Sequence, residues 1–242
     1  MKAIEKIDYK FKNKLVIDTI VTKLDRIVLR RLRAKNIDII FPFYLYQEGI
    51  SGKCHTTLRD AFGDYEVDFL RPEDMKEIAS FPRKHETSSE KELLARLSNG
   101  HKCYGAKYRN KIVAFTWCNF VSCHSILYSF PLKKNEAYLY DAYTTKSFRG
   151  KGIAPYLRCQ FYKALREVNR QLFYSISILP NKPALRFKSK LDARPLMLGV
   201  YIRLSKRWDW SWKIKHYRYP LTGSSILHRE SASYLDSDGY SL

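Results

Sequence analysis

The spacing of apolar side chains predicts a helix near the start of the chain and a strand directly after it. Between residues 14 and 35, apolar residues recur three and four positions apart among lysines and arginines, which is typical of an amphipathic helix with a cationic face. Residues 37–46 are rich in β-branched and aromatic side chains, and the glycines of residues 49–52 favour a turn. We therefore expect a basic helix followed by a short strand.

From residue 65 onward, strand and helix patterns alternate regularly. Ser89 and Glu92 form the capping-box pattern of a helix start, Asn99 and Gly100 favour the end of that helix, and residues 108–110 predict a hairpin turn. Strands are expected over residues 65–70, 102–107, 111–119, 136–145, 172–179, 197–204 and 211–219, and helices after residues 71–74 and over 89–99, 152–169 and 183–191. This order of elements predicts a protein that mixes helices and strands, of the α/β (α+β) class.

The same pattern predicts three parts. Residues 1–62 are expected to be a basic N-terminal extension, residues 63–220 the main domain, and residues 221–242 a polar, serine-rich tail. A length of 242 residues suits one enlarged domain or one domain with an appendage.

The composition favours a folded protein in a reducing compartment. Apolar residues make up 45% of the chain and aromatic residues 14%, which is too much for a wholly disordered protein. Five cysteines without a C-x-x-C pair argue against a disulfide scaffold or a structural metal site, and Cys159 is interpreted as a buried thiol. The apolar stretches are too short to span a bilayer. We expect a cytoplasmic location, with a peripheral membrane contact as the alternative.

The charge adds a first indication of function. The chain has 44 Lys and Arg against 24 Asp and Glu, a formal net charge of +20. Such an excess favours anionic partners, which include nucleic acid, anionic lipid and a phosphate-bearing cofactor or substrate. Charge alone does not choose among these partners, and a merely basic, soluble surface is the alternative explanation.

Residues 147–155 combine two glycines with the start of the long predicted helix. Glycine lets the backbone approach a ligand closely, and a helix start directs free N–H groups and the positive end of the helix dipole into the same turn. The segment lacks the third glycine of the dinucleotide-binding fingerprint, and the motif G-x-x-x-x-G-K-S/T does not occur in the chain. We interpret the segment as a phosphate-binding turn, the alternative being a plain tight turn between strand and helix.

Three segments together resemble the GNAT acetyltransferase superfamily. Arg149-x-x-Gly152-x-Ala154 is similar to the family's R/Q-x-x-G-x-G/A signature, residues 181–191 resemble its later N-x-x-A…K-L helix start, and residues 70–74 resemble its opening strand-to-helix turn. The resemblance covers about residues 65–204. It implies a mixed, largely antiparallel sheet flanked by helices, to which the basic helical extension is added.

The resemblance also implies a site for acetyl-coenzyme A or another acyl-coenzyme A, with no metal. The pyrophosphate would bind the backbone N–H groups of the turn, and the pantetheine would bond to the strand end near Thr144 and to Asn181. The implied cofactor-binding residues are Thr144, Arg149, Gly150, Lys151, Gly152, Ile153, Ala154 and Asn181. The implied activity is acyl transfer to an amine, such as an amino sugar, a small amine or a protein.

Candidate catalytic residues are less well defined by the sequence. An amine must lose its proton before it attacks, and Asp141 and Glu136 are the carboxylates available on the strand before the turn, although either can instead be a surface or salt-bridge residue. Lys188 stands where the family often has a general-acid tyrosine, and it is interpreted either as a proton donor or as a solvated lysine. Tyr138, Tyr140 and Tyr143 are alternatives to the missing tyrosine, or packing residues.

A second interpretation is a non-catalytic module that binds nucleic acid or an anionic membrane surface. Residues 203–218 interleave tryptophans with cations, and the N-terminal helix is basic. The alternation of Trp208, Trp210 and Trp212 equally fits one face of a closing strand, and the helix equally fits packing on the domain that follows. The expected partners are an acyl-coenzyme A and an unidentified amine acceptor. An anionic partner or a membrane surface is the further candidate, through the basic N-terminal helix, and the sequence carries no firm signal for nucleic acid.

Overall fold

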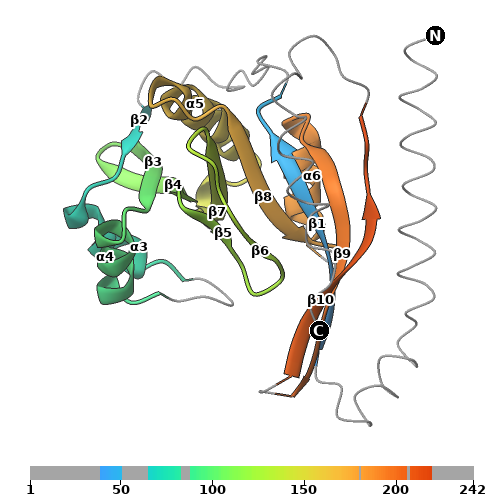
Figure 1. Ribbon diagram of the computed structural model, residues 1–242. Coiled ribbons are helices and arrows are strands. Elements are labelled where there is room, and N and C mark those ends of the chain that lie inside the picture. The colour runs from blue at the N-terminus through green and yellow to red at the C-terminus, as the bar shows by residue number, and fades with distance from the viewer. Residues whose placement is uncertain (1–38, 51–64, 83–87, 180, 206–207, 220–242) are drawn as a thin grey trace, which may run out of the picture.

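The computed structural model describes residues 39–50, 65–82, 88–179, 181–205 and 208–219, and these form one large sheet with helices on both faces (Figure 1). The strands are β1 (Ile39–Glu48), β2 (Tyr65–Phe69), β3 (Lys102–Tyr108), β4 (Lys111–Asn119), β5 (Ser122–His124), β6 (Ser129–Pro131), β7 (Glu136–Thr144), β8 (Leu172–Ile178), β9 (Arg194–Ser205) and β10 (Trp208–His216). The helices are α3 (Met75–Ala79), α4 (Glu90–Ser98), α5 (Ile153–Glu167) and α6 (Lys182–Lys190), with short 3-10 turns η1 (Pro72–Asp74) and η2 (Lys146–Phe148).

The sheet has eight strands in the order β10-β9-β1-β8-β7-β4-β3-β2. Its neighbours pair antiparallel, except β7 and β8, which are parallel. The prediction of a mixed, mostly antiparallel sheet with flanking helices is therefore confirmed. The helix expected before residue 36 lies outside the described residues.

Strand β1 lies inside the sheet rather than beside it. It pairs antiparallel with β8 on one side and with β9 on the other, and Figure 1 shows it in blue beside the orange strand β9. Phe43 and Leu45 are fully buried. A strand that the sequence placed in the N-terminal extension thus completes the core of the sheet, whereas the proposed division at residues 62 and 220 stays a prediction.

The two faces of the sheet carry different helices because strand side chains alternate between them. Helices α3 and α4 pack on the face that bears Phe115 and Trp117. Helix α5 packs on the opposite face, against Ala114 and Cys118. The sequence analysis assigned no strand to the residues of β5 and β6, which form a hairpin that packs with β1 and β8.

The four cysteines in the described residues are buried. Cys103, Cys118 and Cys123 are free, but Cys159 is disulfide-bonded, so its interpretation as a thiol is wrong. None of the helices in the described residues has the length and apolar content that a membrane-spanning segment needs.

Strands β7 and β8 separate part-way along their length, and this separation positions the site. Their parallel pairing runs from Glu136 and Leu172 to Tyr138 and Tyr174 and ends there. Beyond that point β7 stays paired with β4 and β8 stays paired with β1. The two strands therefore diverge and leave an opening in the middle of the sheet.

Candidate functional site

The glycine turn, residues 149–154, leads from the open end of β7 into helix α5. Gly150 and Gly152 have φ angles of +81° and +85°, a backbone region that glycine enters without strain. A Cβ atom on either glycine would meet nothing within 4 Å, so the backbone angle and not lack of space requires glycine here. The first backbone bond of α5 runs from the Tyr156 N–H to the Gly152 carbonyl. The N–H groups of Ile153 and Ala154 precede that bond and are available to an anion.

Two cationic side chains belong to this turn. The Arg149 Nε donates to the Thr144 carbonyl at 2.9 Å, and its guanidinium lies 5.5 Å from the centre of the Tyr143 ring. The Lys151 ammonium lies 5.0 Å from the centre of the Phe148 ring. Both side chains are exposed, so their charges add to the positive end of the α5 dipole at the same place.

A cavity of about 280 Å³ lies where β7 and β8 separate, and we call it the inter-strand cavity. It is bounded by the end of β7, the first two turns of α5 and the start of α6. Its lining residues are Phe115, Thr116, Ala142, Tyr143, Thr144, Arg149, Ala154, Leu157, Arg158, Asn181, Pro183, Ala184 and Phe187. Four residues singled out by sequence, Thr144, Arg149, Ala154 and Asn181, therefore meet around one cavity, and the glycine turn adjoins it.

Asn181 has a local structural role as well. Its side-chain oxygen accepts a hydrogen bond from the Ala184 N–H at 3.1 Å, which caps the start of α6. This bond uses one lone pair of the oxygen and leaves both amide N–H₂ donors, so Asn181 can still donate to a ligand while it caps the helix.

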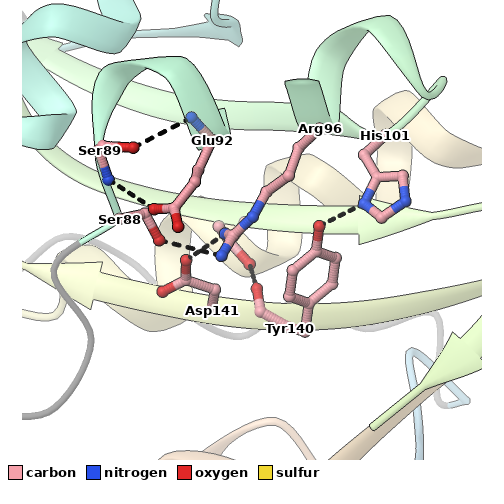
Figure 2. Close-up of polar contacts among 8 residues, drawn as sticks. Ser88, Ser89, Glu92, Arg96, His101, Tyr140 and Asp141 are labelled. Atoms are coloured by element: carbon pink, nitrogen blue, oxygen red, sulfur yellow. Dashed lines mark hydrogen bonds and ion pairs between the residues drawn. The ribbon is translucent and has the colours of Figure 1, made fainter. Parts of the chain in front are cut away.

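Asp141 lies in a β-bulge next to the cavity. Phe115 pairs with Tyr143 and Trp117 pairs with Tyr140, so two residues of β7 oppose one residue of β4. Asp141 has a φ of +44°. Its carboxylate accepts a hydrogen bond from Arg96 at 2.8 Å, as Figure 2 shows.

Helix α4 brings Arg96 to the bulge because its start is firmly fixed. The Ser89 hydroxyl accepts from the Glu92 N–H and the Glu92 carboxylate accepts from the Ser89 N–H, the capping box that the sequence predicts (Figure 2). Arg96 also donates to the Ser88 hydroxyl at 3.0 Å. No motif in the sequence pointed to Arg96, because its partner Asp141 is 45 residues away along the chain.

His101 and Tyr140 form a second pair beside the bulge. The Tyr140 hydroxyl lies 2.5 Å from Nδ1 of His101 (Figure 2). Burial, together with the charge of Arg96 and with His124, lowers the pKa of His101, and burial raises the pKa of Tyr140. At neutral pH the pair therefore consists of an uncharged imidazole and a protonated phenol. Tyr140 also stacks on Tyr138 at 5.6 Å, so these tyrosines pack, as one of the two interpretations expected.

Comparison with known proteins agrees with this geometry. A model of the acetyltransferase (GNAT) family matches residues 66–192, which is more than half of the chain and includes the glycine turn and Asn181. The chain belongs to the GNAT acetyltransferase family. No curated protein matches it.

Solved structures share the GNAT fold at low sequence identity. A GNAT-family acetyltransferase from Colwellia psychrerythraea is 14% identical, with a TM-score of 0.50 over 77% of this chain and 61% of that one. A functionally unknown conserved protein from Staphylococcus epidermidis is 10% identical, with a TM-score of 0.51 over 74% of this chain and 66% of that one. The chain spans 57 to 66% of the length of these and the other leading structures it matches.

In this GNAT chain, Glu136 lies far from the inter-strand cavity. It is buried at the start of β7, where its carboxylate accepts from the Lys133 N–H at 2.9 Å and from the Tyr174 hydroxyl at 3.1 Å. Ala142 comes six positions further along the strand, a distance of about 20 Å. The structure brings Asp141, but not Glu136, to the neighbourhood of the cavity.

The other residue at a family position, Lys188, is not solvated. It is 4% exposed, and its ammonium donates to the Glu48 carboxylate and, at 2.7 Å, to the Ser175 hydroxyl. The Tyr162 hydroxyl also donates to the Glu48 carboxylate, and Nε of Arg158 lies 3.6 Å from an oxygen of the same carboxylate. Burial alone would raise the pKa of Glu48, but Lys188 and Arg158 outweigh it and lower that pKa to about 2. The interpretation of Lys188 as a solvated lysine is therefore wrong. The sequence did not point to its partner, because Glu48 lies outside the residues that resemble the family.

Strand β10 forms an edge of the sheet. Trp210 and Trp212 are 42% and 68% exposed, on one face of this strand as their alternation predicts.

Within the described residues there is no cluster of three or more His, Cys, Asp or Glu side chains that could hold a metal ion.

Proposed function

We propose that this GNAT chain transfers an acyl group from acyl-coenzyme A to an amine. One observation carries the proposal: the glycine turn at the start of α5 lies next to the cavity between the diverging strands β7 and β8. The first suits a pyrophosphate and the second suits an extended, partly polar arm.

The residues present fit coenzyme A. The N–H groups of the glycine turn would bind the pyrophosphate, with Arg149 and Lys151 adding charge. The β7 backbone from Leu139 to Thr144 has lost its pairing with β8, so its edge can bond an extended pantetheine as an added strand does. The Asn181 amide would donate to the same arm. When bound, the acyl-coenzyme A supplies a thioester carbonyl activated for attack by an amine.

The bulge in β7 is where we place the chemistry. Inserting an extra residue into a strand frees backbone groups from the ladder, and an N–H freed near Ala142 can bond the thioester oxygen as negative charge develops on it. Asp141 is our candidate base for the attacking ammonium, directly or through water. In the reaction the C–N bond forms, the C–S bond breaks, and one proton leaves the nitrogen.

A specific observation favours a second candidate function, contact with an anionic surface. Trp210 and Trp212 are exposed on β10 beside lysines, and the chain carries a net charge of +20. Exposed aromatics among cations suit a lipid headgroup layer or a nucleic acid. This contact would use an edge of the sheet and leave the inter-strand cavity free.

The experiment that tests the first proposal is a screen of amines with acetyl-coenzyme A, in which the release of thiol is measured over time. The panel includes amino sugars, polyamines, amino acids and lysine peptides. We expect at least one class to raise thiol release above hydrolysis in the wild-type chain and not in Gly152→Glu, which places an anion in the glycine turn. Amine-dependent release that Gly152→Glu leaves unchanged would contradict the proposal.

A further inference from the structure

Arg158 is a buried cation in the wall of the inter-strand cavity. It is 2% exposed, lies in the second turn of α5, and lines the cavity together with Leu157 and Phe187. Its Nε and Nη1 atoms have no hydrogen-bond partner. Buried guanidinium groups normally satisfy their N–H donors, so this one calls for an acceptor that the described part of the chain does not provide.

Glu48 does not meet that need. Its carboxylate already accepts from the Lys188 ammonium and the Tyr162 hydroxyl, and the nearest Arg158 nitrogen, Nε, lies 3.6 Å away, too far for a good hydrogen bond. Two cations therefore share one carboxylate beside the cavity. Burial lowers the pKa of Lys188 to about 8, which still leaves it mainly charged at neutral pH. The cluster of Glu48, Lys188 and Arg158 carries a net positive charge.

The position of Arg158 separates it from the glycine turn. Arg158 comes five positions after Ile153, the first residue of α5, a distance of about 7.5 Å along the helix axis. The guanidinium lies 5.5 Å from the centre of the Phe187 ring, in a partly apolar setting where an ionic hydrogen bond is strong. A pyrophosphate on the turn would leave these donors unpartnered, so they remain available to a second anionic group of the ligand deeper in the cavity.

We propose that the acyl group carried by this chain ends in a carboxylate, as malonyl and succinyl groups do, and that Arg158 binds this carboxylate. The inference rests on the proposed function, because it assigns the acyl end of the same site. A guanidinium presents a planar fork of donors that matches a carboxylate better than a neutral methyl group does.

Calorimetric titration of the full chain with succinyl-coenzyme A and with butyryl-coenzyme A tests this assignment without an acceptor. The two acyl groups have the same number of carbons, and only succinyl ends in a carboxylate. We expect the wild-type chain to bind succinyl-coenzyme A about 10- to 100-fold more tightly, as an ionic hydrogen bond implies. Arg158→Gln should abolish the preference, and Arg158→Lys should retain part of it.

Arg166→Gln is the matched control. Arg166 lies on the same helix outside the cavity, where it donates to the Gly49 carbonyl at 2.6 Å, so its replacement should keep the preference. Equal affinity of the wild-type chain for the two thioesters, a comparison that needs no variant to fold, would overturn the inference and leave the proposed function standing. Retention of the preference in a folded Arg158→Gln variant would overturn it too. Failure of both thioesters to bind would instead remove the proposed function and the inference with it.

Discussion

The carboxylate of Glu48 is fully buried, and its ionisation is coupled to folding. Its pKa is about 2 in the folded chain, against 4.5 for an ordinary glutamate. Between these two values the unfolded chain binds the proton more readily than the folded chain, so lowering the pH favours unfolding. The stabilisation is complete above about pH 4.5 and is lost as the pH falls toward 2.

Urea unfolding between pH 7 and pH 3 should detect this coupling. We expect the free energy of unfolding of the wild-type chain to fall more steeply below pH 4.5 than that of Glu48→Gln, which cannot take up the proton. The variant should also be less stable at pH 7, because it leaves Lys188 and Arg158 buried without their counter-charge. Parallel curves for the two proteins would show that Glu48 is not ionised in the fold.

Asp141 and Glu136 are distinguished by their places on β7. Asp141→Asn keeps a residue that tolerates the positive φ of the bulge, and Glu136→Gln keeps the shape of a buried side chain. With an acceptor in hand, we expect Asp141→Asn to depress the rate most at low pH, with partial recovery as pH rises toward the pKa of the amine, which is about 10.4 for a lysine side chain. Glu136→Gln should lower stability with little change in the pH–rate profile.

The affinity for acyl-coenzyme A should be unchanged in Asp141→Asn, which separates catalysis from binding. If both variants keep the wild-type profile, the base is a water chain or another group, and the His101–Tyr140 pair becomes the next one to replace. A changed profile in Glu136→Gln alone would contradict the placement of the chemistry at the bulge.

At the scale of elements, the local residue pattern predicted individual helices and turns better than it predicted which strands pair. The capping box of α4, the glycine turn and the long helix after it follow from residues close together in sequence, and each is found where expected. The place of β1 was not predictable in this way. Its residues indicate a strand, but nothing local specifies that it pairs between β8 and β9, more than 120 residues later. Glu48 was missed for the same reason, since only that pairing brings it beneath Lys188.

Two deletions test the role of β1. Removing residues 1–35 should leave a folded chain that binds acetyl-coenzyme A, because β1 and all its pairs remain. Removing residues 1–50 exposes the inner edges of β8 and β9 and takes away Phe43, Leu45 and Glu48, so we expect an insoluble or unfolded product. Circular dichroism and gel filtration compare the two. A folded, binding-competent product of the longer deletion would show that β1 is dispensable.

At the scale of the whole molecule, the sheet joins parts of the site that the sequence keeps apart. The parallel pairing of β7 and β8 ends early, and this one irregularity creates the cavity that α5 and α6 then enclose. The sequence indicated the turn, Thr144 and Asn181 through their motifs. It did not indicate Arg158 or the bulge, because a buried arginine in a helix and an extra residue in a strand become visible only when their neighbours across the sheet are known.

Calorimetric titration with acetyl-coenzyme A, comparing Gly152→Glu with Gly100→Glu, tests the central claim most directly. Both glycines have a positive φ, +85° and +82°, and a Cβ atom added to either would meet nothing within 4 Å, so the backbone strain is matched and only the place of the new charge differs. We predict that Gly100→Glu binds as the wild-type chain does and that Gly152→Glu binds about 10- to 100-fold more weakly, a loss of about 1.4 to 2.8 kcal/mol. Wild-type affinity in a folded Gly152→Glu variant would contradict the assignment of the glycine turn to the pyrophosphate.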